Sequence, residues 1–224
     1  MRRQPVITID GPAGAGKSTV SRLLAQRLSF INLDTGALYR AIAYHLIQAR
    51  WEGDSQELSI LCSQVKISLR ERGGQFLIFV DHEDVTEKIR TEQIALLASR
   101  ISAVPLVREK LLSVQRETAV RGGIVAEGRD MGTVVFPQAE IKFFLDASII
   151  ERANRRTVEL RGNGEGSSLE EVREAILLRD HQDRERAIAP LKAAPDAITI
   201  DSTRKTVSEV VDIMLEAVER FYNS

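Results

Sequence analysis

The feature that most constrains this chain is a glycine-rich segment at residues 11–18, Gly-Pro-Ala-Gly-Ala-Gly-Lys-Ser. It follows an apolar, β-rich run at residues 6–10 and precedes an amphipathic segment that predicts a helix over about residues 17–28. The pattern G-x-x-x-x-G-K-[ST] between a strand and a helix is typical of a phosphate-binding loop. Its glycines let backbone N–H groups turn toward a phosphate at the positive end of the helix dipole. A plain glycine turn would satisfy the same spacing without binding anything.

Such a loop predicts binding of a nucleoside triphosphate. We expect Lys17 to reach the β- and γ-phosphates and the Ser18 hydroxyl to ligate Mg²⁺. The expected ATP-binding residues are Gly11, Pro12, Ala13, Gly14, Ala15, Gly16, Lys17, Ser18 and Thr19. The chain contains neither the Asn-Lys-x-Asp motif of GTPases nor the Leu-Ser-Gly-Gly-Gln motif of ABC proteins. A small-molecule kinase, a regulatory nucleotide switch and an ATPase subunit that works with partner chains remain open.

The rest of the chain alternates strands and helices in the manner of an α/β fold. A helix is expected at about residues 37–49, and further strands at residues 30–33, 124–126, 141–145 and 197–200. Three helix starts carry Ser or Thr followed three residues later by Glu, the spacing of a capping box: Ser148 and Glu151, Ser168 and Glu171, and Thr206 and Glu209. These patterns predict a P-loop core with a parallel sheet of about five strands flanked by helices.

A different pattern interrupts this alternation at residues 62–100. Apolar segments at 65–69 and 76–80 flank Arg72-Gly73-Gly74 and predict an antiparallel hairpin, which a short segment near Asp84-Val85 extends. Helices are expected next, at about 91–102 and 106–119. The expected division is a core at residues 1–61, 101–160 and 169–224, an inserted lobe with a small antiparallel sheet at 62–100, and a short lid loop at 161–168.

Composition and charge exclude several classes of partner. The 224 residues carry a formal net charge of −1, so no global charge attracts nucleic acid or an acidic membrane. The single cysteine, Cys62, excludes an intramolecular disulfide and fits a reducing compartment. No apolar stretch approaches the roughly 20 residues of a membrane span. We therefore expect a soluble cytoplasmic protein, and a monomer because no long apolar stripe is left over for a partner.

A kinase needs a second anion-binding pocket that faces the γ-phosphate. Asp34 and Arg40 follow the second strand, and Glu127, Arg129 and Asp130 follow a later one. Since the carboxyl ends of parallel strands open on one crevice, we expect these side chains beside the phosphate loop, with Glu127 as a candidate for Mg²⁺ through water. Arginine grips phosphate by two parallel hydrogen bonds, and the chain has 24 arginines against 7 lysines. A compositional bias would give the same excess, and pairing of Asp34 with Arg129 would explain two of the charges without any ligand.

A third charged cluster lies at residues 179–186. Arg179, Asp183 and Arg186 are spaced i, i+4 and i+7, so one helix face would carry all three. A solvated, salt-bridged face explains this spacing equally well. His181 points elsewhere, toward solvent, and receives no catalytic role.

Taken together, these segments resemble the bacterial cytidylate kinases, which belong to the nucleoside monophosphate kinase superfamily. The matching stretches are residues 9–19, 33–40, 128–137 and 186–191. Many P-loop proteins share the first, whereas Gly-Arg-Asp-Met-Gly-Thr-Val-Val-Phe-Pro at 128–137 and Arg-Ala-Ile-Ala-Pro-Leu at 186–191 are much more specific. The resemblance spans nearly the whole chain and includes the inserted lobe.

The resemblance implies a transfer of the ATP γ-phosphate to CMP or dCMP, with Mg²⁺, in pyrimidine nucleotide metabolism. Its implied catalytic residues are Lys17, Arg40, Arg129 and Arg186. Its implied CMP-binding residues are Thr35, Arg40, Ser99, Arg108, Arg129, Asp130, Arg179, Asp183 and Arg186. In this assignment Asp130 and Arg108 read the base, with Ser99 nearby on base or sugar. Arg40, Arg129 and Arg186 hold the monophosphate, while Arg179 and Asp183 meet the ribose.

Some positions depart from the family pattern. Glu127 stands where family members often carry Asp, and Thr35 replaces a frequent Ser. The lid tip is rich in glycine and lacks an aromatic residue, which leaves four lid-side arginines as candidates for the ATP phosphates: Arg152, Arg155, Arg156 and Arg161. Kinases for another monophosphate, or for a small hydroxy acid such as shikimate, are the nearest alternatives.

Overall fold

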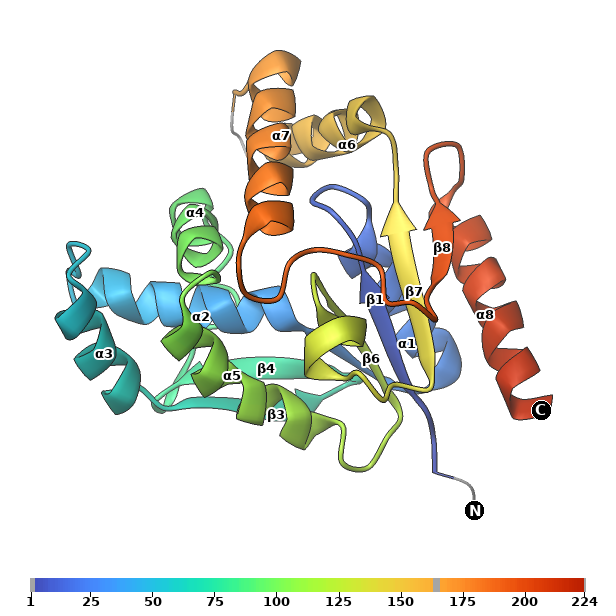
Figure 1. Cartoon of the computed structure of the whole chain (residues 1–224), viewed down its shortest axis with the longest axis horizontal. Helices are drawn as coiled ribbons and strands as arrows, with labels where there is room; N and C mark the ends of the chain where they lie inside the picture. The colour runs from blue at the N-terminus through green and yellow to red at the C-terminus, as the bar shows by residue number, and fades with distance from the viewer. Residues whose placement is uncertain (1–2, 163–165, 224) are drawn as a thin grey trace.

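The computed structural model describes residues 3–162 and 166–223. Five parallel strands form the larger part of its sheet, as predicted (Figure 1). They are arranged in the order β2 (Ile31–Asp34), β6 (Ile124–Gly128), β1 (Val6–Asp10), β7 (Ile141–Asp146) and β8 (Ile198–Asp201). Every residue of β1 and β6 is buried, because helices cover both faces of a parallel sheet. Because these strands are parallel, their carboxyl ends all lie at the same end of the sheet, where the phosphate loop begins.

Eight α-helices surround this sheet in the described part of the chain. They are α1 (Lys17–Leu28), α2 (Thr35–Gln48), α3 (Ser55–Gln64), α4 (Glu92–Ile101), α5 (Pro105–Thr118), α6 (Ile149–Gly162), α7 (Leu169–Glu185) and α8 (Val207–Asn223). In Figure 1, α1 and α8 lie beside β1, β7 and β8, whereas α2 to α5 gather around the other end of the sheet, and α6 and α7 rise above the strand ends. Among the described residues, no helix has both the length and the apolar character needed to cross a bilayer.

Alternate residues of the central strands serve two separate apolar cores. Ile7 and Ile9 of β1 pack with α1 and α8, while Val6 packs on the opposite face with residues that follow β6. A third core joins α2, α4 and α5 to the strands of the hairpin. Packing on both faces of the sheet thus fixes the carboxyl ends of the strands.

The hairpin predicted near Gly73 and Gly74 is present. It consists of β3 (Ile67–Arg72) and β4 (Gln75–Val80), which are antiparallel, and β5 (Glu83–Asp84) adds to β4. The two turn glycines have φ of 62° and 76°, in the left-handed region that favours glycine. One pair, Asn32 with Gln75, joins the hairpin to β2, so the described strands form one continuous sheet.

Helix ends follow the capping signals closely. Ser168 with Glu171, and Thr206 with Glu209, form complete reciprocal boxes. The Ser148 box is half formed: the Glu151 N–H donates to the Ser148 hydroxyl, but the Ser148 N–H donates to Thr203 instead. In the expected lid loop at residues 161–168, Gly162 ends α6 and Ser168 caps α7, and residues 163–165 lie outside the described residues.

Two elements were not predicted from the sequence. One is α3, whose first turn is capped by Asp54 accepting from the Glu57 N–H at 2.7 Å. The other is a π-helical turn, η1 (Met131–Val135), directly after β6. The division into core, inserted lobe and lid stays a prediction.

Candidate active site

The phosphate loop links β1 to α1 with the backbone that the motif requires. Gly16 caps α1 with φ of 92°, and Gly14 has φ of 74°. A Cβ at Gly14 would lie 2.9 Å from the carbonyl oxygen of Arg152, so no larger residue fits there. Lys17 is buried, and its Nζ donates to the Pro12 carbonyl at 2.7 Å across the loop. The loop therefore presents the start of α1 and one ammonium group to the same space.

The surroundings of Lys17 lower the pKa of its ammonium group. Burial and the nearby Arg129 guanidinium lower the pKa of Lys17 to about 7, while Glu127 acts in the opposite direction. Arg179 adds a further positive charge and Asp183 a further negative one. Lys17 thus lies within electrostatic reach of side chains from two other segments, β6 and α7.

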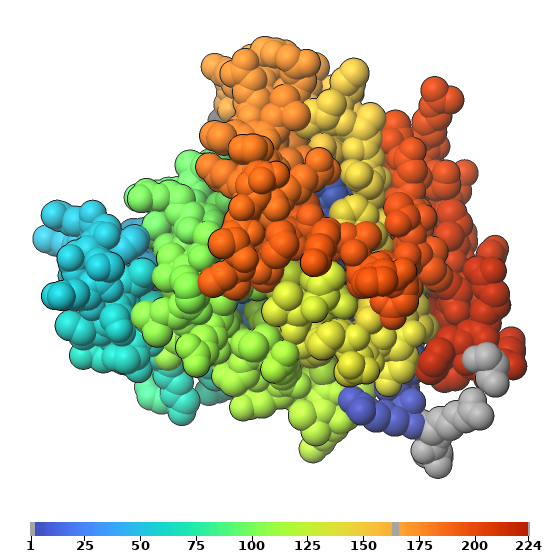
Figure 2. All heavy atoms as spheres, in the orientation of Figure 1, coloured from blue at the N-terminus to red at the C-terminus, as the bar shows by residue number. Residues whose placement is uncertain are grey.

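Side chains of α6 and α7 also form hydrogen bonds with the backbone of the phosphate loop. Arg152 donates from Nη1 to the Ala13 carbonyl at 3.0 Å and pairs with Asp180 at 2.5 Å. The Ala13 N–H donates to Asp180 at 3.4 Å, so one buried ion pair contacts both the backbone N–H and the backbone carbonyl of Ala13. Figure 2 shows α7 lying across this face, with a patch of the blue N-terminal segment visible beside α6 and α7. Arg152 therefore contacts the loop backbone.

The other lid-side arginines have different partners. Arg155 donates to the Ser202 carbonyl at 2.7 Å and to the Ala15 carbonyl of the loop at 3.4 Å. Arg156 instead pairs with Glu92 of α4 at 2.7 Å, which joins α6 to α4. Arg161 is exposed near the end of α6.

Asp34 and Arg40 lie at the start of α2, where the sequence places them. Asp34 caps the helix by accepting from the Ala37 N–H at 3.1 Å, and its other oxygen pairs with Arg40 at 2.7 Å. The alternative pairing of Asp34 with Arg129 is wrong, because Arg129 pairs with Asp183 of α7 at 2.8 Å. Each carboxylate thus orients one of the arginines expected to hold phosphate.

Glu127 lies between the start of α1 and the start of α2. It accepts from the Ser18 hydroxyl at 2.5 Å, and its own carbonyl accepts from the Thr35 hydroxyl at 2.7 Å. Burial and the charge of Asp34 raise the pKa of Glu127, against the pull of Lys17. Two oxygen-bearing side chains therefore meet where the metal ion is expected. In the described ranges, no group of three or more His, Cys, Asp or Glu is arranged to hold a metal alone.

Asp130 and Arg108 form a buried pair beside these groups. The Arg108 Nη2 atom contacts the Asp130 carboxylate, its Nη1 donates to the Ser102 carbonyl at 3.1 Å, and its guanidinium lies 5.8 Å from the centre of the Tyr39 ring. Burial raises the pKa of Asp130 even though Arg108 and Arg186 oppose the rise.

Ser99 lies half-buried on α4, where its carbonyl accepts from the Ser102 hydroxyl. Within the described residues, no hydrogen bond or ion pair joins Ser99 to Asp130 or Arg108.

The predicted helix face of Arg179, Asp183 and Arg186 needs one correction. Helix α7 ends at Glu185, and Arg186 follows it in an extended conformation, with φ of −62° and ψ of 137°. The chain brings Arg186 into the cluster all the same: its guanidinium lies 3.6 Å from Asp130 and 3.8 Å from Asp183. The residues that the spacing grouped therefore do lie close together, but Arg186 is not on the helix face. His181 is exposed, as predicted.

Several of these arginines have unused hydrogen-bonding capacity. In the described part of the chain, three buried N–H positions of the cluster have no hydrogen-bond partner: Nε of Arg40, Nε of Arg179 and Nη2 of Arg186. Burial and the charge of Arg129 lower the pKa of Arg179 to about 10. Buried donors without a partner and crowded positive charge are both unfavourable, so a bound anion would stabilise this cluster.

Two residues of the site escaped sequence reasoning. Asp10 ends β1 and accepts from the N–H groups of Met131 and Gly132, both at 2.7 Å. Its position as a charged residue at the end of an apolar strand was a signal that could have been used. Asp180, the partner of Arg152, is separated from Ala13 by 167 residues, and no local pattern reveals that contact.

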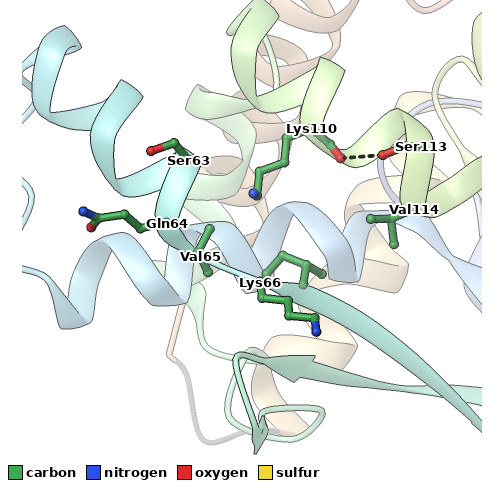
Figure 3. A pocket seen from close by; sticks show the side chains of 8 residues that line it. Ser63, Gln64, Val65, Lys66, Lys110, Ser113 and Val114 are labelled. Carbon is green, nitrogen blue, oxygen red and sulfur yellow. Dashed lines mark hydrogen bonds between the residues drawn. The ribbon is translucent and has the colours of Figure 1, made fainter.

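Two hollows of the surface lie outside this cluster. One, of about 440 Å³, is formed between the end of α3, the start of β3 and α5, and Lys66 and Lys110 line it (Figure 3). The carbonyl end of α3 borders this hollow and disfavours an anion there. The other, of about 390 Å³, is lined by residues that include His45 and His82. Neither contains a residue predicted for the site.

The cytidylate kinase family model matches residues 7–220. The chain belongs to this family. A cytidylate kinase of Citrifermentans bemidjiense is 47% identical over 96% of this chain and 92% of that protein. One of Geobacillus thermodenitrificans is 47% identical over 97% and 98% of the two chains. A solved structure of an uncharacterized protein from Eubacterium ventriosum has a TM-score of 0.52, covers 97% of this chain and 99% of that one, and is 12% identical, so it shares the fold alone.

Proposed function

We propose that this protein transfers the γ-phosphoryl group of ATP to CMP or dCMP, giving ADP and CDP or dCDP. The observation that carries the proposal is the set of buried N–H groups without a hydrogen-bond partner on Arg40, Arg179 and Arg186. Of these arginines, Arg179 lies within electrostatic reach of the phosphate-loop lysine. A nucleotide switch or an ATPase needs only the loop, whereas a kinase needs this second anion site. Membership of the cytidylate kinase family supports the same reaction.

The acceptor phosphate belongs among the arginines. Arg40 and Arg129 are oriented by Asp34 and Asp183, and Arg186 reaches between Asp130 and Asp183. Guanidinium groups bind phosphate through paired hydrogen bonds, so the free donors match a phosphate dianion better than they match solvent. Arg179 and Asp183 of α7 lie next to this position and are assigned to the ribose.

Recognition of the base rests on Asp130 and Arg108. Cytosine offers an N4 amino donor beside N3 and O2 acceptors, which complements a carboxylate next to a guanidinium. Uracil presents an O4 acceptor and an N3–H donor instead, so it would set an oxygen against the Asp130 carboxylate. Because these groups are buried, a mismatch leaves them unpaired, and UMP should be rejected by more than shape alone allows.

The reaction itself asks little covalent chemistry of the protein. An oxygen of the CMP phosphate forms a bond to the γ-phosphorus as the bond from that phosphorus to the β,γ-bridging oxygen breaks, and ADP departs. A loose transition state gains most from positioning and from neutralisation of charge, which Lys17, Arg40, Arg129 and Arg186 can supply. A phosphate dianion needs no general base to attack.

A magnesium ion fits the oxygen-bearing groups at Ser18 and Glu127. These side chains lie 2.5 Å apart at the mouth of the loop, and Mg²⁺ prefers oxygen ligands with several from phosphates and water. Ser18 would hold the ion directly and Glu127 through water. When bound with the triphosphate, the ion supplies neutralisation of charge on the β- and γ-phosphates.

The lid side completes the proposal. The expected lid loop at residues 161–168 would close over ATP and exclude water, which otherwise competes as acceptor. Arg155 and Arg156 are the better placed candidates for the ATP phosphates, because their side chains are partly exposed, whereas that of Arg152 is buried in its pair with Asp180. Monomeric behaviour stays a prediction.

A coupled assay of ADP release tests the proposal with CMP, dCMP, UMP, AMP and shikimate as acceptors. We expect turnover with CMP or dCMP to exceed that with UMP and AMP by at least about a hundredfold in kcat/KM. Equal use of UMP or AMP would contradict the assignment of Asp130 and Arg108 to the base. ADP release that is independent of any acceptor would favour an ATPase instead.

A further inference from the structure

The turn that carries Asp130 is held by a residue at the end of β1, directly before the phosphate loop. Asp130 has φ of −147° and ψ of 26°, outside the regular helix and strand regions, and η1 begins directly after it. Within η1, the Val135 N–H donates to the Asp130 carbonyl and the Phe136 N–H to the Met131 carbonyl. This ladder leaves the first two N–H groups of the turn, on Met131 and Gly132, to find partners elsewhere.

Asp10 provides both partners. Its Oδ1 accepts from the Met131 N–H and its Oδ2 from the Gly132 N–H, each at 2.7 Å. The side chain is buried, and in the register of the sheet Asp10 lies opposite Gly128 of β6. Two short bonds from one carboxylate to successive peptide groups fix both the position and the rotation of this backbone.

The surrounding packing leaves the turn little freedom to compensate. A Cβ on Gly128 would lie 2.7 Å from the Met131 side chain and 2.8 Å from the Thr35 hydroxyl. On its other side, Asp10 continues directly into the phosphate loop, where a Cβ on Gly11 would lie 2.0 Å from the Leu145 carbonyl oxygen. One residue therefore connects the backbone of the phosphate loop to the backbone that presents Asp130.

We infer that Asp10 is a positioning residue for base recognition, whose carboxylate fixes the turn that presents Asp130 to cytosine. The inference rests on the proposed function, since it adds a residue to the same site. A carboxylate is required because it offers two acceptors. An asparagine accepts through one atom and turns an N–H donor toward the other peptide N–H, so Asp130 must shift. A shift of about 1 Å in a binding group is enough to lose much of its selectivity.

Asp10→Asn tests the inference through a ratio that does not depend on how much protein is folded. We expect the CMP preference, kcat/KM for CMP divided by kcat/KM for UMP, to fall at least about tenfold, while the KM for ATP stays within about twofold. Asp54→Asn is the matched control. It makes the same acid-to-amide change at a carboxylate that accepts one backbone N–H, in the exposed cap of α3, and should leave the preference unchanged.

Gly132→Ala provides a second variant if Asp10→Asn does not fold. Its Cβ would lie 3.4 Å from the Asp10 Oδ2 atom and 3.0 Å from the Thr8 hydroxyl, so it disturbs the same contact from the turn side and should lower the same ratio. Losses of kcat/KM that are equal for CMP and UMP in these variants would overturn the inference and leave Asp10 a purely structural cap. A wild-type protein without preference for CMP would overturn the proposed function and the inference together.

Discussion

At the scale of single residues, Lys17 is the side chain whose protonation the site controls most directly. Burial and the Arg129 guanidinium lower the pKa of Lys17 to about 7, and Glu127 opposes that effect. A bound triphosphate places negative charge beside the ammonium group and raises its pKa again. Nucleotide binding above pH 7 should therefore be accompanied by proton uptake.

We expect binding of a nonhydrolysable ATP analogue at pH 8 to take up most of one proton. At this pH the free phosphates are already ionised, since their last pKa lies near 6, so the uptake reports on the protein. Isothermal titration calorimetry in two buffers of different ionisation enthalpy measures it. Lys17→Met should take up little, and its kcat should be about 10²–10³ lower. Equal proton uptake by Lys17→Met and the wild type would assign the proton to another group.

At the scale of elements, one buried ion pair joins α6 and α7 to the phosphate loop. Arg152 of α6 and Asp180 of α7 are each more than nine-tenths buried, and together they hold Ala13. Removing the charge of one partner leaves the other buried without compensation, which is far more unfavourable than the loss of an exposed pair. The arrangement couples the position of α6 and α7 to the backbone that binds ATP.

Asp180→Asn is therefore expected to lower the free energy of unfolding by about 3–5 kcal/mol and to raise the KM for ATP more than that for CMP. Urea denaturation and steady-state kinetics measure the two effects. Glu170→Gln on the same helix serves as the comparison, because its pair with Arg173 is exposed and contributes below about 1 kcal/mol. Similar small losses in both variants would show that the buried pair does not hold the loop.

Elements with a local signal were predictable, and those fixed by distant contacts were not. The phosphate-loop helix begins and ends where its pattern indicates, at Lys17 and Leu28. Helix α3 was predictable too, since Asp54 and Glu57 mark its start and Leu58 and Cys62 its buried face. By contrast, η1 depends on Asp10, which is 121 residues away. The end of α7 before Arg186 depends on the following chain, where Ala189 has φ of 51° ahead of Pro190.

At the scale of the whole molecule, the candidate site lies at the end of the sheet where parallel strands from distant parts of the chain have their carboxyl ends. Position in the sheet brought Asp34, Glu127 and Asp130 near the phosphate loop, so general rules of topology located them. Which charges pair could not be derived, because pairing depends on side-chain geometry across elements: Arg129 chose Asp183 of α7 over Asp34. The fold thus follows from pattern, and the fine structure of the site from tertiary contacts.

The buried carboxyl group of Asp10, at the end of β1, should also make the free energy of unfolding depend on pH. Burial raises the pKa of Asp10 from 3.8 to about 6; the bonds from Gly132 and Met131 and the charge of Lys17 oppose the rise, and the charge of Asp130 adds to it. Because the folded-state pKa lies above the unfolded value, the stability that Asp10 contributes is complete below pH 3.8. It is lost as the pH rises through 6.

The wild type should accordingly lose about 2 kcal/mol of unfolding free energy relative to Asp10→Asn between pH 4 and pH 7, since each pKa unit corresponds to about 1.4 kcal/mol and part of the loss has already occurred at pH 4. Urea titrations of both proteins at pH 4, 5, 6 and 7 measure the difference, which cancels the groups that titrate alike in each. The difference should level off above pH 7, where Asp10 is ionised in both states. Parallel stability curves, or a wild type that gains on the variant as the pH rises, would show that burial does not raise the pKa of Asp10 in the folded protein.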